Sequence, residues 1–146
     1  MGSPFCSNST QRRQQVDCRM RLHGILVDTN KGITPVKFDY NDYHDINEQL
    51  RCQWSTCISR NIGGMNVDIW CDEEALLKPA REPAILTRNK ETRKIIEVLY
   101  GNCFICLHNK KGEVKSLPYH DYDKILLTQA SITEGNRTFQ VLQCEI

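Results

Sequence analysis

A turn, a strand and an acidic exit follow one another in the stretch Gly63-Gly64-Met65-Asn66-Val67-Asp68-Ile69-Trp70-Cys71-Asp72-Glu73-Glu74-Ala75-Leu76-Leu77-Lys78-Pro79. The glycine pair favours a tight turn, because glycine adopts positive φ at no steric cost. Apolar and polar residues then alternate, which predicts a strand with one solvated face. Trp70 falls on the polar side, so we expect another element, such as a helix, to cover part of that face. We interpret the three carboxylates after the strand as a solvated strand end, with metal binding or acid–base chemistry as alternatives.

The residues before this stretch predict a helix. Asn41 or Asp42 is the expected N-cap, and the helix runs to about Trp54. Ile46, Leu50 and Trp54 recur every fourth residue and form an apolar stripe on a polar helix. We therefore expect Trp54 to lie in the core.

A β-hairpin is predicted from Leu22 to Tyr40. The segment from Asp28 to Gly32 has the composition of a turn and separates two apolar runs. Pro35 has no N–H to donate to a neighbouring strand, so the second strand is expected at an edge, or to begin there.

After the central stretch, Lys90 to Tyr100 is predicted to be a second helix, with Asn89 as its cap. Ile95, Ile96 and Leu99 would form its buried side, and Gly101 would end it. The remaining segments predict a strand that is buried on both faces, a short strand, a short helix and a last strand. These are Asn102 to Leu107, Ala84 to Leu86, Tyr119 to Leu127 and Thr138 to Cys144.

The length of 146 residues suits one domain, and the net charge of +1 does not favour a nucleic-acid or membrane-surface protein. No apolar run approaches the roughly 20 residues that span a bilayer. Residues 1–19 are polar and lack apolar periodicity, so we predict a flexible tail followed by a single domain over residues 20–146. Met20 opens this domain and is an alternative start to Met1.

Eight cysteines without an apolar secretion signal indicate reduced thiols in a cytosol. Cys103 and Cys106 have the CxxC spacing of zinc and redox sites, but in a strand these positions face opposite sides. We interpret both as buried structural cysteines. A zinc-stabilised module that uses these two with Cys52 and Cys57 is the alternative, and no metal or cofactor is predicted.

Two His-Asp pairs, His44-Asp45 and His120-Asp121, resemble acid–base pairs. Both lie at predicted helix starts, where aspartate is favoured by capping and by the helix dipole, so we interpret them as caps. No nucleophile elbow, P-loop or dinucleotide fingerprint is present, and we predict no catalytic residues.

Basic residues concentrate between Lys78 and Lys115, which suggests a face for a phosphate-rich partner or a solvated surface without function. Few aromatic residues interleave with them, which argues against single-strand binding. The candidate binding face comprises Arg88, Lys90, Arg93, Lys94, Lys110 and Lys111.

The central stretch and the segments on either side of it resemble the bacterial and phage family called domain of unknown function 3846, over roughly Asp45 to Leu126. The features that carry the resemblance are Ile62-Gly63-Gly64, Val67-Asp68-Ile69-Trp70-Cys71-Asp72-Glu73-Glu74 with Leu77-Lys78, Tyr100-Gly101-Asn102-Cys103-Phe104-Ile105-Cys106, and Gly112-Glu113 with Ser116-Leu117. The resemblance implies an intracellular accessory protein from a phage or plasmid and supplies no catalytic residues.

These observations predict an α+β fold with a mixed or antiparallel sheet and two to three helices. We favour a cytoplasmic accessory or binding protein without catalytic activity, whose partner is an unidentified protein or small molecule. The alternatives that stay open are the zinc-stabilised module, a nucleic-acid or phosphate binder that uses the 78–115 region, and an enzyme.

Overall fold

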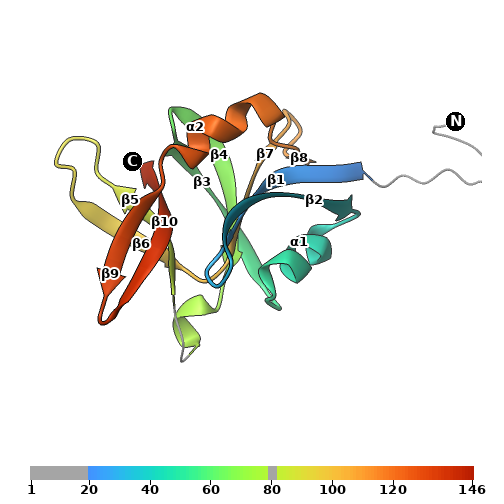
Figure 1. The fold of residues 1–146 in the computed structure, drawn as a ribbon. Helices are drawn as coiled ribbons and strands as arrows, with labels where there is room; N and C mark the ends of the chain where they lie inside the picture. The colour runs from blue at the N-terminus through green and yellow to red at the C-terminus, as the bar shows by residue number, and fades with distance from the viewer. Residues whose placement is uncertain (1–19, 79–81) are drawn as a thin grey trace, which may run out of the picture.

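The computed structural model describes residues 20–78 and 82–146, which form one mixed sheet with two short α-helices, an α+β fold that is mostly β (Figure 1). The predicted tail, residues 1–19, lies outside the described residues. The elements are β1 (Met20–Asp28), β2 (Gly32–Tyr40), α1 (Tyr43–Leu50), β3 (Ser55–Ile62), β4 (Met65–Asp72), a 3₁₀ turn (Ala75–Leu77), β5 (Pro83–Arg88), β6 (Ile95–Tyr100), β7 (Cys103–His108), β8 (Val114–Lys115), a 3₁₀ turn (Tyr119–Asp121), α2 (Tyr122–Leu126), β9 (Ala130–Glu134) and β10 (Arg137–Glu145).

The strands lie side by side in the order β2-β1-β7-β4-β3-β10-β5-β6, with β8 paired to β7 and β9 paired to β10. The β10–β5 pair is parallel, and the other described pairs are antiparallel. The sheet curves enough for Arg60 on β3 to reach Glu97 on β6, with Nη2 at 2.9 Å from Oε1. Hairpin β1–β2 therefore ends the sheet on one side, and hairpin β5–β6 ends it on the other.

The strand register builds the main core from a row of isoleucines. Ile58 on β3 pairs with Ile69 on β4, which pairs with Ile105 on β7, which in turn pairs with Ile25 on β1. Three of the four are fully buried, and Ile58 packs against them. Because alternate residues of a strand face opposite sides, this row places Leu26, Trp70 and Phe104 on the other face of the sheet.

A second core lies between the sheet and α1, as expected from the position of Trp70. Trp70 packs against a cluster that includes Ile46 and Leu50 of α1 and Phe104 of β7. The predicted cap is also confirmed, because the Asp42 side chain accepts a hydrogen bond from the backbone N–H of His44 within a capping box. Helix α1 thus covers the polar-side tryptophan.

Helix α1 is shorter than predicted, and the expected burial of Trp54 is wrong. The helix ends at Leu50, because Arg51 adopts a left-handed conformation with φ 55° as C-cap and its N–H returns to Asn47 and Glu48. Trp54 lies beyond this reversal and is 51% exposed. Its backbone carbonyl instead accepts the N–H of Glu73 at the end of β4.

The predicted second helix, Lys90 to Tyr100, is wrong. Residues 89–94 form a turn, and Ile95–Tyr100 forms β6, an antiparallel partner of β5. The segment contains two isoleucines and a valine, and β-branched residues favour strands. Ile95 and Ile96 remain 46% and 52% exposed, so the apolar spacing of this segment does not mark a buried helix face.

The predicted glycine turn is confirmed and joins β3 to β4. Gly63 has φ 62°, and a Cβ atom there would lie 2.2 Å from the backbone oxygen of Lys124 in α2. A side chain at this position is therefore excluded by the positive φ and by the contact. The turn and α2 lie directly against each other.

Most of the other predicted elements are confirmed. The hairpin from Leu22 to Tyr40 is β1–β2, and the short and last strands are β5 and β10. The expected doubly buried strand is β7, which lies between β1 and β4, and the predicted short helix is α2 with the 3₁₀ turn before it. In the part of the chain that the structure describes, no helix is long and apolar enough to cross a membrane.

Candidate functional site

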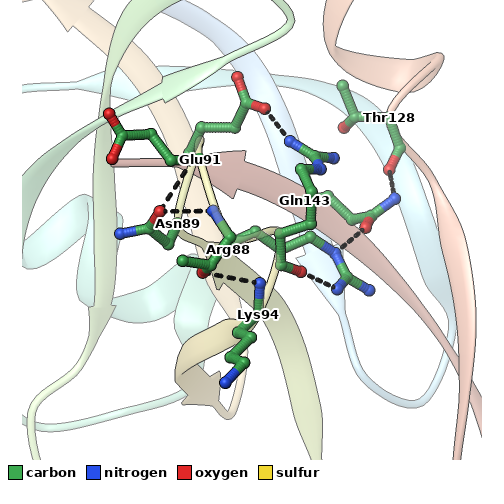
Figure 2. A network of polar contacts seen from close by, with 9 residues as sticks. Arg88, Asn89, Glu91, Lys94, Thr128 and Gln143 are labelled. Atoms are coloured by element: carbon green, nitrogen blue, oxygen red, sulfur yellow. Dashed lines mark hydrogen bonds and ion pairs between the residues drawn. The ribbon is translucent and has the colours of Figure 1, made fainter.

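The turn between β5 and β6 is fixed by its own polar groups (Figure 2). The Asn89 side-chain oxygen accepts hydrogen bonds from the backbone N–H groups of Glu91 and Thr92, at 2.8 and 3.0 Å. Arg93 adopts a left-handed conformation with φ 64°, and its N–H donates to the Asn89 carbonyl. Such local side-chain bonds are the usual means by which asparagine stabilises a turn.

Two arginine side chains lie beside this turn and are held by different elements. Arg88 on β5 donates from Nε to the Gln143 side chain on β10 and from Nη1 to the Arg93 carbonyl, both at 2.8 Å. Arg93 pairs with the Glu145 carboxylate. Gln143 is itself fixed by a bond from Nε2 to the Thr128 carbonyl. The guanidinium groups are therefore held in place by three segments that are distant in sequence.

Both arginines line a pocket of about 250 Å³. Its other walls come from the β3–β4 turn, the segment after α2 and β10, including Gly63, Gly64 and Thr128. A guanidinium carries five N–H donors, and the bonds described above use two of those on Arg88 and one on Arg93. The remaining donors suit an anion with several oxygen atoms.

The six residues of the candidate binding face do not share one surface. Arg88, Lys90, Arg93 and Lys94 lie on or next to the β5–β6 turn. Lys110 and Lys111 lie in the β7–β8 turn, which Asn109 fixes through the N–H groups of Lys111 and Glu113. Figure 1 shows these two turns well apart. The structure thus brings four of the six together.

The CxxC cysteines point to opposite faces of β7. Cys103 belongs to the main core, and Cys106 packs in the α1 cluster with Phe104. Burial raises the pKa of Cys106 to about 12, and burial also raises the pKa of Cys103 well above its ordinary value. The other two zinc candidates, Cys52 and Cys57, lie after α1 and on β3. Across residues 20–78 and 82–146, no three His, Cys, Asp or Glu side chains form a group that would hold a metal ion.

The two His-Asp pairs differ from each other. Asp45 completes the capping box of α1, as expected, and its neighbour His44 contacts Asp42 instead, at 3.1 Å. Asp121 occupies the N-cap position of α2 but makes no capping hydrogen bond, so that part of the interpretation is wrong. Its Oδ1 atom instead lies 3.2 Å from Lys124 Nζ and 3.7 Å from His120 Nε2.

The three carboxylates after β4 separate. Asp72 accepts the backbone N–H of Glu74 and pairs with Lys78, facing a pocket of about 350 Å³, whereas Glu74 lines a neighbouring pocket together with His44. Glu73 is exposed. The strand therefore ends in local hydrogen bonds and ion pairs, and the acidic run does not converge.

One polar cluster was missed by sequence reasoning. Asp68, which is 6% exposed, accepts hydrogen bonds from the Ser59 hydroxyl at 3.2 Å and from His108 Nδ1 at 2.7 Å. All three side chains line a pocket of about 340 Å³. The alternation of β4 places Asp68 on the polar face, but finding its partners required the register of three strands.

The comparison with protein families matches residues 20–129 to the family described as Domain of unknown function (DUF3846). The chain belongs to this family. The match covers β1 to α2 and therefore includes the hairpin β5–β6 and its turn. No curated protein and no solved structure matches the chain.

Proposed function

We propose that this protein is a binding protein without catalytic activity, which holds the phosphate group of a small molecule at the β5–β6 turn. In keeping with the family resemblance, we place it among the cytoplasmic accessory proteins of phages or mobile elements. The observation that supports this proposal is the convergence of Arg88 and Arg93 on one pocket.

The fixed position of the arginine side chains lowers the entropic cost of binding an anion. Arg88 is already tied to Gln143 and to the Arg93 carbonyl, so a ligand need not order a mobile side chain. Arginine also presents its donors in a planar fork that matches phosphate oxygens. Glu145 offsets part of the positive charge, so an anion with more than one negative charge is expected to bind better than chloride.

Size and charge favour a small ligand over a nucleic acid. A pocket of about 250 Å³ accommodates one phosphate group, and the full chain carries a net charge of only +1. Tight binding to nucleic acid normally uses many phosphate contacts along an extended basic surface. The two lysine-containing turns are too far apart to form one here (Figure 1).

The test is a calorimetric titration of the full chain with inorganic phosphate, a nucleoside triphosphate and a short single-stranded oligonucleotide. We expect phosphate and the triphosphate to bind, and Arg93→Gln to weaken binding by about ten-fold, as for loss of a charged hydrogen bond. The matched control is Lys110→Gln/Lys111→Gln, which removes two positive charges from the β7–β8 turn and should leave binding unchanged.

Absence of binding by the wild-type chain, or equal weakening in both variants, would overturn the proposal. Thermal melting of each variant checks that the fold is kept. Stronger binding of the oligonucleotide than of the triphosphate would shift the function to nucleic acid.

A second candidate function is acid–base catalysis at Asp68 and His108. A carboxylate only accepts hydrogen bonds, so Nδ1 of His108 carries the proton and Nε2 of the neutral ring is left as a base. Turnover of any compound in an unbiased substrate screen, lost in His108→Gln, would replace the binding proposal with this one.

A further inference from the structure

A second polar pocket, of about 350 Å³, lies where four separate segments of the fold meet. The β1–β2 turn contributes Thr29, the C-cap of α1 contributes Arg51, the end of β4 with the following 3₁₀ turn contributes Asp72 and Ala75, and the β6–β7 turn contributes Asn102. Among the described residues, none lines both this pocket and the arginine pocket at the β5–β6 turn. Its volume lies within the range of about 300–1,000 Å³ that small-molecule sites occupy.

The wall at the β6–β7 turn is fixed by hydrogen bonds. Asn102 is 9% exposed, and its Oδ1 accepts the N–H of Thr29 at 3.0 Å while its Nδ2 donates to the Leu50 carbonyl at 3.3 Å. The neighbouring Gly101 has φ 85°, and a Cβ atom there would lie 3.2 Å from the Cβ atom of Ala75. A side chain at position 101 would therefore be strained and would crowd this wall. The pocket is thus formed without a ligand.

Charges of both signs line the pocket and balance each other. Arg51 and Lys78 supply two positive charges, and Asp72 and Glu82 supply two negative charges. The two carboxylates are nearly buried, with side chains that are 6% and 13% exposed. The formal charges of the described lining residues therefore cancel. The arginine pocket differs, because its described lining carries an excess of one positive charge.

Several of these groups keep donors and acceptors for a ligand. Arg51 donates from Nη2 to Asp28 at 3.0 Å, which uses one of its five N–H donors. Lys78 pairs with Asp72 and has three N–H donors. Asp72 also accepts the N–H of Glu74 at 2.9 Å, and a carboxylate can accept about four hydrogen bonds. The pocket therefore offers donors to a carboxylate and acceptors to an ammonium group.

We propose that this pocket binds a free α-amino acid with a polar side chain. The ligand carboxylate lies against Arg51 and Lys78, and the ligand ammonium group lies against Asp72 and Glu82. A zwitterion brings no net charge into a pocket that is itself balanced, so each ligand charge meets an opposite one and none is left unpaired. This site is separate from the proposed phosphate site, and neither proposal depends on the other.

The remaining lining residues favour a polar side chain on the ligand. Thr29, Asn30 and Asn102 carry hydroxyl or amide groups, whereas the apolar part of the described lining comes from Leu50 and Ala75. The side-chain amide of glutamine can both donate and accept hydrogen bonds. Glutamine is therefore the probe, and we expect leucine, which has a similar size, to bind more weakly.

The test is a calorimetric titration of the full chain with glutamine, leucine, N-acetylglutamine and glutamine α-amide. The two analogues each lack one of the two charges, and they also imitate the two ends of a peptide. We expect glutamine to bind, both analogues to bind about ten-fold more weakly, and Lys78→Gln to weaken glutamine binding by a similar factor. The matched control is Lys110→Gln/Lys111→Gln, which removes two surface charges and should leave glutamine binding unchanged. Thermal melting checks that each variant is folded.

Nuclear magnetic resonance of the wild-type chain provides a measurement that does not depend on the variants. Glutamine should shift the signals of Thr29, Asn30 and Asn102, and should leave those of Gly63 and Gly64 in the arginine pocket unchanged.

No saturable binding at millimolar glutamine, or signal shifts confined to the arginine pocket, would overturn the proposal. So would unchanged glutamine binding in folded Lys78→Gln. An analogue that binds as tightly as glutamine would assign the pocket to one end of a peptide, and leucine binding as tightly would rule out selection for a polar side chain; either result overturns the proposal as stated.

Discussion

The hairpins β1–β2 and β5–β6 end the same sheet but are stabilised in different ways. Hairpin β1–β2 contributes the fully buried Ile25 to the main core, and its turn is anchored by Asp28, which is 4% exposed. Hairpin β5–β6 also buries Ala84 and Ile85 of its inner strand β5 in this core, but its outer strand β6 leaves Ile95 half-exposed and its turn consists mostly of exposed polar residues. We therefore expect the burial of each individual strand, and not its position at a sheet end, to decide how much that strand contributes to stability.

The largest expected effect tests this difference directly. Ile25→Ala should lower the free energy of unfolding by about 2–5 kcal/mol, because it opens a cavity in the row of isoleucines. Ile95→Ala should cost under about 1 kcal/mol, since its side chain is already 46% exposed. Urea denaturation of both variants measures the contrast. Equal costs would mean that the outer strand β6 is as firmly packed as β1.

A smaller effect is expected at the β1–β2 turn. Burial alone would raise the pKa of Asp28, but hydrogen bonds from the N–H groups of Asn30 and Lys31 and from Arg51 lower it below the ordinary value of 3.8. The charged carboxylate therefore stabilises the fold above pH 3.8, and this contribution is lost as the pH falls through the lowered pKa.

Asp28→Asn should accordingly cost about 2 kcal/mol at pH 7, from the loss of charged hydrogen bonds. The difference from the wild-type chain should stay constant down to about pH 5 and shrink below pH 3.8. Urea midpoints measured across this range test the sign. A difference in stability between wild type and Asp28→Asn that grows on acidification would contradict the described bonds. The control is Asp39→Asn, which changes an exposed ion pair with Arg21.

The smallest expected effect concerns residues 1–19. A polar segment without apolar periodicity gains too little from burial to offset the roughly 1–2 kcal/mol per residue that ordering its backbone costs. A chain that begins at Met20, the first residue of β1, should therefore melt at the same temperature as the full chain. A clear fall in melting temperature would show that the tail contributes to the β1–β2 end and that the domain boundary is misplaced.

The sequence was sufficient to predict the elements that have one apolar and one polar face. Strands β2 and β4 alternate between apolar and polar residues, and Asp42 marks the start of α1 by its side-chain chemistry. Strand β6 was mistaken for a helix because Ile95, Ile96 and Leu99 also fit a helical spacing. Over six residues the two periods cannot be separated without knowing what each side contacts.

The polar sites were predictable only in part. Arg88 and Arg93 were identified from charge density, and their common pocket depends on Gln143 and Thr128, which are distant in the chain. The bond between Asp68 and His108 joins residues 40 positions apart through the pairing of β4 with β7. Local sequence patterns carry no information on which strands become neighbours. Contacts between distant strands therefore cannot be predicted from such patterns.

The place of β10 between β3 and β5 has a consequence during protein synthesis. The hairpin β5–β6 is complete at Tyr100, but it adjoins the rest of the sheet through β10, which begins at Arg137. At a translation rate of about 5–20 residues per second, the hairpin waits about 2–7 s for that strand. During this interval its apolar side chains and both strand edges are exposed on the ribosome, where chaperones recognise such segments.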